Sequence, residues 1–283
     1  MQRRNFLLTA LSAALPLSLG RIAHADAAPL SLVLHPFNAT PAYVEQHQGL
    51  VRFLEQKLQR KIRLSASGDF DAYFDGLMTG EFDVTICPPH FAVMAIQKAI
   101  YSPVMKFKRP LEPVLIVRKG SSMQQAAELA GSRIAMADRM AFLPIAVIRW
   151  LQDAGLTADK DYRLIEQPTF QAAIQLVLKG EADAALAGVP VLRLLPQEVQ
   201  QQIRTIPTHL QLPNQFVLIH RRLGNATAGA LKSALRDFSV DHADGKAFFD
   251  KLGLGGFDEI SGETLAFLHP YAQTTRAMLM LIP

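Results

Sequence analysis

The segments Gly80-Glu81-Phe82-Asp83-Val84 and Gly180-Glu181-Ala182-Asp183-Ala184 are two copies of one pattern, Gly-Glu-x-Asp followed by an apolar residue. In each copy an apolar segment with helical spacing precedes the glycine, and a strand-like segment follows it. A glycine in that position is typical of the residue that ends a helix. Because both copies share the same helix-to-strand context, they predict two comparable α/β halves.

The alternation of strand-like and helical segments extends over most of the chain. The predicted strands are residues 30–35, 62–66, 82–87, 114–118, 133–137, 162–167, 184–187 and 215–220. The predicted helices are residues 43–58, 70–78, 91–99, 123–129, 143–154, 171–178, most of 226–249 and 264–280. Repeated β-α-β units imply parallel sheets with helices on their faces. The predicted fold class is therefore α/β, with two lobes that are each a mainly parallel sheet flanked by helices.

The first 25 residues have the features of an export signal. Arg3 and Arg4 precede an apolar stretch, Phe6–Leu19, which is short for a membrane span, and residues 23–25 (AHA) fit the small-x-small cleavage rule. The Arg-Arg-Asn-Phe-Leu sequence also resembles a twin-arginine signal. We therefore expect cleavage after Ala25 and a mature protein in the periplasm, with export by the Tat or the Sec route left open.

The composition excludes several classes of protein. Of the 283 residues, 49% are hydrophobic and 19% are charged, as in ordinary globular domains. Loss of the signal, which carries Arg3, Arg4 and Arg21 and no acid, lowers the formal net charge from +4 to +1. Such a near-neutral surface does not favour nucleic-acid binding. A single cysteine excludes an intramolecular disulfide, and the scattered histidines show no metal spacing, so neither a cofactor nor a metal is expected.

Together these features resemble the periplasmic binding proteins of phosphate, phosphite and phosphonate ABC transporters. The resemblance covers most of residues 30–250 and rests on the order of the elements, on the GEFDV segment, on LIVRKGSSMQQAAELAGSRIAMAD (115–138) and on LKGEAD (178–183). It implies a type II periplasmic binding protein, in which the ligand lies in a cleft between two lobes. We expect lobe one to comprise residues 26–112 plus 221–283 and lobe two residues 113–220. The chain is expected to cross between them near Arg109–Pro113 and Pro213–Asn214.

One segment departs from the family pattern. The resemblance implies a Ser/Thr-rich turn before a proline in lobe two, where hydroxyls and helix-terminal N–H groups capture an anion. The corresponding segment here, Asp138–Pro144, contains no hydroxyl. Arg139 is the best anion partner in this lobe, with a solvated loop charge as the alternative, and Met140 could add a soft sulfur contact.

The segment Cys87-Pro88-Pro89-His90-Phe91 is the main candidate site, because it follows a strand at the sheet edge where open α/β sheets bind ligands. Its prolines remove two backbone donors, which leaves the Cys87 thiol and the His90 imidazole as polar contacts, with Phe91 beside them. Cys87 is either a small buried residue or a soft ligand for a thiophile, as in the arsenite-sensing branch that this chain also resembles.

Further candidate ligand contacts end strands or begin helices, and so are expected to face the cleft. They are His35, Phe37, Tyr73, Thr169, Phe170 and Gly188. His35 could instead be a local hydrogen-bonding group, and Thr169 is at least a helix N-cap.

Three functions follow from these expectations. The leading one is a monomeric solute-binding protein that closes over a small oxyanionic ligand and delivers it to an inner-membrane ABC permease. The second is a sensor of arsenite or another thiophile through Cys87 that signals to a membrane histidine kinase. The third is an enzyme with Cys87 as nucleophile and His90 as base. Because no third triad residue, oxyanion-hole motif or nucleotide-binding loop accompanies that pair, no catalytic residue is expected.

Overall fold

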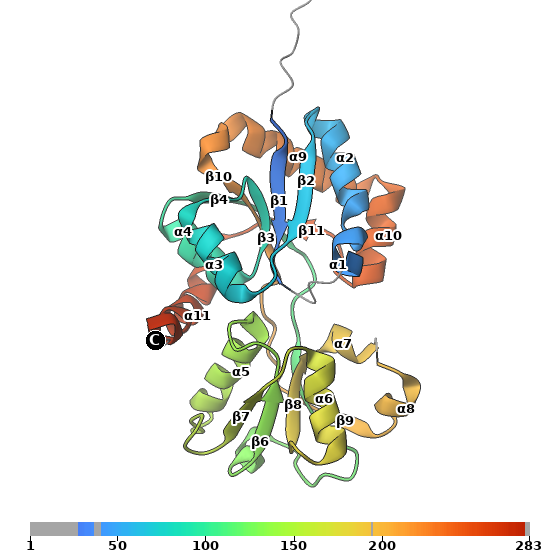
Figure 1. Ribbon diagram of the computed structural model, residues 1–283, viewed down its shortest axis with the longest axis vertical. Coiled ribbons are helices and arrows are strands. Elements are labelled where there is room, and N and C mark those ends of the chain that lie inside the picture. The colour runs from blue at the N-terminus through green and yellow to red at the C-terminus, as the bar shows by residue number, and fades with distance from the viewer. Residues whose placement is uncertain (1–27, 37–40, 194, 281–283) are drawn as a thin grey trace, which may run out of the picture.

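The computed structural model describes residues 28–36, 41–193 and 195–280, which form two lobes with one β-sheet each (Figure 1). The first lobe contains β1 (Leu30–Leu34), α1 (Pro41–Gln46), α2 (Gln48–Leu58), β2 (Ile62–Ala66), α3 (Phe70–Thr79), β3 (Val84–Cys87), α4 (Pro89–Gln97), β4 (Tyr101–Phe107), β10 (Phe216–His220), α9 (Gly224–Val240), α10 (Ala243–Leu252), β11 (Phe257–Asp258) and α11 (Gly262–Met280). The second contains β5 (Pro113–Arg118), β6 (Arg133–Met136), α5 (Phe142–Asp153), β7 (Arg163–Glu166), α6 (Phe170–Lys179), β8 (Ala184–Gly188), α7 (Val189–Arg193), α8 (Gln197–Gln200) and β9 (Ile203–Pro207). The predicted α/β class is confirmed.

Both sheets are more mixed than predicted. The first has the strand order β11-β4-β10-β3-β1-β2, in which β1 is parallel to β2 and β3, whereas β10 is antiparallel to β3 and β4. The second has the order β7-β6-β8-β5-β9, in which β6 is parallel to β7 and β8, whereas β5 is antiparallel to β8 and β9. The physical reason is the route of the chain. Because β5 and β10 follow the two crossings, they start where β1, β3, β6 and β8 end and run the opposite way.

The boundary expected after residue 220 is placed too late. Phe216–His220 forms β10 in the first sheet, between β3 and β4, so this strand belongs to the first lobe. The two crossing segments lie side by side, because Leu111 and Leu212 exchange backbone hydrogen bonds of 2.8 and 3.0 Å. The Asn214 side-chain amide also donates to the Arg109 carbonyl, at 2.9 Å. These bonds tie together the two strands of chain that join the lobes.

Two hydrophobic clusters fill the first lobe, one on each face of its sheet. Leu32 and Leu34 of β1 pack into the cluster with α2, α9 and α10, whereas Val33 points to the other face, with α3 and α4. This alternation has the two-residue period of a strand that is buried on both sides. The cluster on the α3 and α4 face continues into the core of the second lobe, so apolar packing extends across the junction of the lobes.

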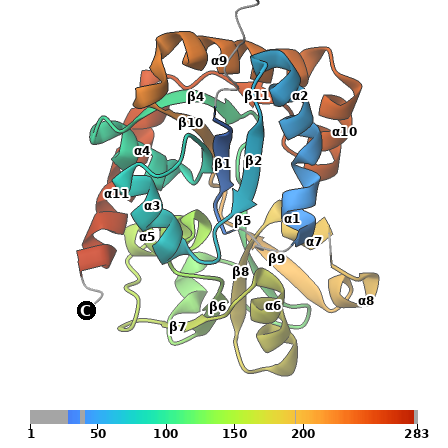
Figure 2. The ribbon, with the colours of Figure 1, turned by 45° about the horizontal axis from the view of Figure 1, so that its top comes forward.

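Some element boundaries differ from the predicted ones for local reasons. The helix predicted over residues 43–58 is divided at His47 into α1 and α2, whereas the helical segments predicted over most of 226–249 form α9 and α10. The last helix, α11, packs along α4 as expected for the first lobe, and its contacts extend to α5 of the second (Figure 2). Tyr271 on α11 meets the Phe142 ring edge-on at 5.5 Å. The C-terminal helix therefore bridges the two lobes.

Candidate functional site

A small, partly open pocket lies at the junction of the two lobes and has a volume of about 50 Å³. The first lobe contributes residues from the ends of β1 and β3 and from the start of α3, the second contributes the starts of α5 and α6, and both crossings contribute one residue. The lining residues are His35, Phe70, Pro88, Pro89, Leu111, Ala141, Phe142, Leu143, Phe170 and Gln215. This is the carboxyl edge of the parallel strands in both sheets, where open α/β sheets bind their ligands.

Larger hollows occur elsewhere on the described surface, and they are more open to solvent. One of about 420 Å³ lies between α4 and α11, and another of about 700 Å³ lies between α2 and α9, and both are built from the first lobe alone. A third, of about 290 Å³, lies beside the two crossings and the start of α11, but no residue of α5 or α6 lines it. We therefore take the smaller interlobe pocket as the candidate site, because both lobes and both crossings form it.

Phe70 and Phe170 occupy equivalent positions in the two lobes. Each is the first residue of a helix, α3 or α6, and each follows an N-cap residue with extended backbone. The Asp69 carboxylate accepts from the Ala72 N–H at 2.7 Å, and the Thr169 hydroxyl accepts from the Ala172 N–H at 3.1 Å. These caps fix the first turn of each helix, so a phenylalanine from each lobe is held against the pocket.

The helix starts around the pocket offer few hydrogen-bond donors. The first residue of α4 is Pro89 and its N-cap is Pro88, and neither has a backbone N–H. At the start of α5 the N-cap is Ala141, whose side chain cannot contact a ligand through a hydroxyl. The Thr169 hydroxyl accepts the N-cap hydrogen bond of α6, and its own O–H can still donate. The side chains at the starts of α4 and α5 therefore contribute apolar surface rather than hydroxyl donors.

His90 links the two lobes, although it does not line the pocket. Its Nε2 donates to the Met140 carbonyl at 3.0 Å, because a carbonyl oxygen can only accept. Its ring stacks on that of Phe142, with centroids 5.1 Å apart and 12° between the planes. Burial lowers the pKa of His90 to about 3, so the imidazole is neutral at physiological pH. Met140 thus meets His90 through its backbone, while its buried side chain belongs to the hydrophobic cluster.

His35 lines the pocket as expected. Its Nδ1 lies 3.3 Å from the Ile86 carbonyl, which places the proton on Nδ1 and leaves Nε2 as an acceptor. Burial lowers its pKa to about 4. Both histidines of this region are therefore uncharged at neutral pH.

Cys87 is a buried core residue rather than part of the pocket wall. Its side chain is 0% exposed, and Sγ lies 3.4 Å from the Pro88 carbonyl oxygen. Burial raises the pKa of the Cys87 thiol well above its usual value, so the thiolate does not form at neutral pH. Of the two alternatives that the sequence left open for this residue, the structure supports the small buried residue.

Arg139 is engaged with an acid of its own lobe. Its Nε donates to Glu166 Oε2 at 2.8 Å, and its backbone N–H donates to Oε1 of the same carboxylate at 2.9 Å. This pairing raises the pKa of Arg139, and the side chain is more than half exposed. Arg139 is not a lining residue of the pocket, and its charge is paired with that of Glu166.

The remaining predicted contacts have other positions. Tyr73 is buried and bonds to Thr85 at 2.6 Å, and Phe91 lies in the core against Phe70 and Phe74. Gly188 ends β8 beside Leu143, and Phe37 lies outside the described residues. Of the single residues predicted as ligand contacts, His35 and Phe170 line the pocket, and Pro88 and Pro89 of the main candidate segment line it as well.

Most of the pocket wall was not predicted as site. Phe70 could have been found from its position, because it begins α3 as Phe170 begins α6. Leu111 and Gln215 lie on the crossings, and Leu143 lies on the first turn of α5. None of these residues is charged or nucleophilic, and Gln215 is the one polar side chain among them, so a search for chemically active side chains passes over them.

Two further observations concern the described part of the chain. Within residues 28–36, 41–193 and 195–280, no three His, Cys, Asp or Glu side chains are grouped so that they could hold a metal ion. The helices of the same residues do not combine the length and the apolar character of a membrane span.

Solved structures share this fold at low sequence identity. XAC2383 from Xanthomonas citri bound to ATP superposes with a TM-score of 0.73 and 14% identity, over 89% of this chain and 99% of that chain. PhnD1 from Prochlorococcus marinus in complex with methylphosphonate gives 0.73 and 14%, over 88% and 99%. The alkanesulfonate-binding protein SsuA from Xanthomonas axonopodis pv. citri, bound to MOPS, gives 0.64 and 19%, over 92% and 96%. At these identities the structures establish the fold alone.

The sequence also matches a family model, described as the periplasmic substrate-binding protein of phosphonate ABC transporters, over residues 32–265. This match includes both sheets and both crossings. The two lobes, the pocket between them and the family match agree, and the chain belongs to the family of periplasmic substrate-binding proteins of phosphonate ABC transporters.

Proposed function

We propose that this protein is the solute-binding component of an ABC transporter, which encloses a small solute between its lobes and presents it to an inner-membrane permease. The observation that carries the proposal is the composition of the pocket, whose wall comes from both lobes and both crossings. Parting of the lobes opens such a wall and closure completes it, so ligand binding and lobe closure are coupled.

The contacts across the cleft favour binding without chemistry. The described residues that line the pocket include no nucleophile, and Cys87 is a buried residue outside this lining, with a thiol whose pKa is raised by burial. His90 uses Nε2 to hold the Met140 carbonyl of the other lobe. Neither residue therefore has the arrangement of an activated nucleophile and its base.

Several finer parts of the proposal rest on the family and the sequence. The family is periplasmic, and the export signal that the sequence predicts for residues 1–25 is in accord with that location. We further propose that the mature protein works as a monomer, with lobes of residues 26–112 plus 215–283 and residues 113–214. The sensor alternative depended on contact between Cys87 and the ligand, and the buried position of Cys87 supports the transport role instead.

A variant that fills the pocket tests the proposal. Ala141 lines the pocket, so Ala141→Trp places an indole inside it, whereas Ala230→Trp places the same group on the exposed side of α9. Equilibrium dialysis is run against phosphate, methylphosphonate, alkanesulfonates and alkylammonium ions, in buffers that lack amines and phosphate. We expect at least one solute to bind the wild type and the Ala230→Trp control, with at least about tenfold weaker binding to Ala141→Trp.

Equal binding by Ala141→Trp, or no binding of any of these solutes by the wild type, would contradict the proposal. Circular dichroism of all three proteins shows whether the variants are folded.

A further inference from the structure

A group of aromatic side chains joins the two lobes beside the pocket. We propose that Phe142 of the second lobe, held between His90 and Tyr271 of the first, is an aromatic clamp that keeps the lobes closed before any solute binds. His90 and Tyr271 do not line the pocket, so they are positioning residues that set how often its two walls meet. The consequence for solute capture rests on the proposed function, whereas the clamp itself does not.

Phe142 is the centre of this clamp and also part of the pocket wall. It is the first residue of α5, and its ring is buried. The His90 ring stacks on it at 5.1 Å, and the Tyr271 ring meets it edge-on at 5.5 Å. Stacked and edge-to-face aromatic pairs at such distances attract each other beyond the effect of buried area. The same ring therefore faces the pocket and binds the second lobe to the first.

Two further contacts cross the junction at the same place. The Nε2 atom of His90 donates to the Met140 carbonyl at 3.0 Å. The Arg149 guanidinium on α5 lies 5.8 Å from the centre of the Tyr271 ring, so a cation of the second lobe faces an aromatic ring of the first. His90, Met140 and Tyr271 are all buried, and such contacts are stronger where water is excluded.

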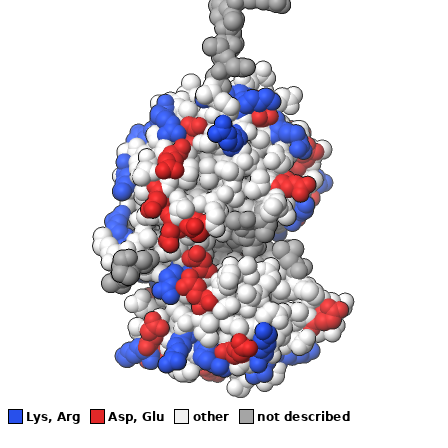
Figure 3. Space-filling model, viewed as in Figure 1, with Lys and Arg blue, Asp and Glu red and all other residues white. Residues whose placement is uncertain are grey.

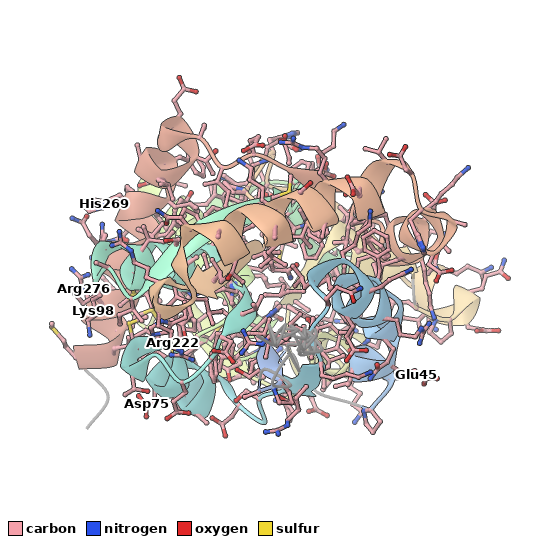
Figure 4. All side chains as sticks on the ribbon, turned by 90° about the horizontal axis from the view of Figure 1, so that it is seen from above. Glu45, Asp75, Lys98, Arg222, His269 and Arg276 are labelled. Carbon is pink, nitrogen blue, oxygen red and sulfur yellow. The ribbon has the colours of Figure 1, made fainter. Side chains whose placement is uncertain are left out.

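The helix that carries Tyr271 is fixed to the first lobe. The side-chain amide of Gln97 on α4 lies 2.9 Å from Nδ1 of His269, and Arg276 donates to the oxygen of the same amide at 3.5 Å. Figure 4 shows His269, Arg276 and Lys98 along one outer edge of this lobe, where α11 runs beside α4. Because α11 is held in this way, the Tyr271 ring moves with the first lobe and loses its contacts with α5 when the lobes part.

Charged groups do not hold the lobes together. Each ion pair between side chains of residues 28–36, 41–193 and 195–280 joins two residues of the same lobe. Burial raises the pKa of Asp138 in the second lobe, and Asp71 and Asp69 of the first lobe contribute to the rise. Figure 3 shows acidic side chains on both sides of the cleft. Their repulsion favours parted lobes, and the aromatic clamp supplies an attraction that opposes it.

The clamp affects how tightly the pocket holds a solute. Only the closed arrangement presents the complete pocket wall, which both lobes form. The apparent dissociation constant then equals the intrinsic constant divided by the fraction of closed molecules. A clamp that keeps most molecules closed therefore raises the solute affinity through residues that do not touch the solute.

Distances between spin labels in the unliganded protein test the clamp. Nitroxide labels are attached at Gln56→Cys on α2 and Gln175→Cys on α6, which are exposed positions in different lobes, whereas the buried Cys87 is not labelled in the folded protein. Double electron–electron resonance then measures the distribution of distances between the lobes. We expect one main distance in the protein that carries only the labels.

Two substitutions weaken the clamp, and a third is the matched control. Tyr271→Leu removes the edge-on contact and the ring that faces Arg149, and Phe142→Leu removes both ring contacts of the clamp. Phe248→Leu removes a buried ring from the other core cluster of the first lobe, away from the junction. We expect each clamp variant to lower the ratio of closed to open molecules at least about fivefold, so that a second distance appears. The control should keep the single distance.

Unchanged distributions in both clamp variants would overturn the inference, and so would a second distance that is as populated without the substitutions as with them. Circular dichroism shows whether each protein is folded. If both clamp variants fail to fold, Arg149→Met provides the test, because it removes only the cation beside the Tyr271 ring; its expected change is about twofold to fivefold, and no change overturns the clamp. Since these distances are measured without solute, failure of the clamp leaves the proposed function to the dialysis experiment, and absence of binding in dialysis leaves the clamp in place.

Discussion

The helices α3 and α6, one in each lobe, begin and end in the same way. Both begin with a phenylalanine behind a capping oxygen, and both end at a glycine with φ of 78°, Gly80 or Gly180. Both lead to an aspartate, Asp83 or Asp183, that accepts from a backbone N–H of the neighbouring strand, at 2.9 and 2.8 Å. The repeated Gly-Glu-x-Asp pattern therefore marks the same helix-to-strand connection in both lobes.

The two lobes differ in what surrounds this shared turn. Asp83 pairs with Arg222, which arrives after the second crossing, and Arg222 also donates to the Gly80 carbonyl. Asp183 pairs with Arg133, which lies on the adjacent strand β6 of the same continuous segment. In the first lobe the arginine of this ion pair thus comes from the chain that returns after the second crossing. In the second lobe both partners belong to one continuous segment. Equivalent substitutions in the two lobes measure what that return contributes.

The largest difference is expected at the two glycines. An added Cβ at Gly80 would lie 2.7 Å from Nε2 of His220, on the returning strand, whereas at Gly180 the nearest atom is 3.6 Å away on Arg118. Both substitutions to alanine cost the strain of a left-handed backbone, and Gly80→Ala adds a steric clash. We expect losses of about 3 kcal/mol for Gly80→Ala and about 1 kcal/mol for Gly180→Ala in urea unfolding. Equal losses would show that His220 moves aside freely.

The pKa values of the two aspartates predict how the stability of each lobe depends on pH. Burial disfavours the Asp83 carboxylate, but the Ser31 amide and Arg222 outweigh this, so the pKa of Asp83 lies below its usual value. The hydrogen bond from Arg133 lowers the pKa of Asp183. Each carboxylate therefore stabilises the fold above the unfolded pKa of about 3.9, and this contribution is lost as the pH falls through the lower, folded pKa.

We expect Asp83→Asn to destabilise the protein by about 1–2 kcal/mol at pH 7, because it removes a charged hydrogen bond that is only partly exposed. The Asp83 side chain is 18% exposed and that of Asp183 is 32% exposed, so Asp183→Asn should have the smaller effect. Both differences from wild type should shrink between pH 5 and pH 2 in urea titrations. A difference that grows in acid would mean that the folded pKa values are raised.

The smallest contrast is expected at the helix caps. Asp69→Ala and Thr169→Ala each remove the side-chain acceptor of one N-terminal N–H. We expect each to lower the free energy of unfolding by about 1 kcal/mol, and the two losses to agree within about 0.5 kcal/mol. A much smaller loss for Asp69→Ala would show that repulsion between the Asp69 and Asp138 carboxylates offsets the role of Asp69 as a cap.

The shared turn was predictable from the sequence because its glycine and aspartate are fixed by local backbone geometry. The strands β4 and β9 were missed, since Pro103 interrupts the first, and in the second the adjacent polar residues Arg204 and Thr205 break the two-residue alternation of a strand. The assignment of Phe216–His220 to the first sheet depends on where the chain goes after its second crossing. No local pattern contains that information.

The candidate site was predictable only where it coincides with secondary-structure ends. His35 and Phe170 follow from the rule that ligands bind at the carboxyl edge of a sheet. The same rule selected Cys87, whose side chain points into the core instead, because one residue along a strand reverses the direction of the side chain. That Phe70 and Phe170 line the same pocket follows only from the arrangement of the two lobes in the structure.

The most direct test of the account is whether one solute contacts both lobes at these two phenylalanines. Fluorine NMR of protein labelled with 4-fluorophenylalanine measures this, with the resonances of Phe70 and Phe170 assigned through Phe→Leu variants and that of Phe53, in the other core cluster, as an internal control. During titration with the solute that binds most tightly in equilibrium dialysis, the account predicts that the Phe70 and Phe170 resonances shift with one dissociation constant while that of Phe53 stays in place. Binding that leaves both Phe70 and Phe170 unshifted would contradict the interlobe pocket as the site.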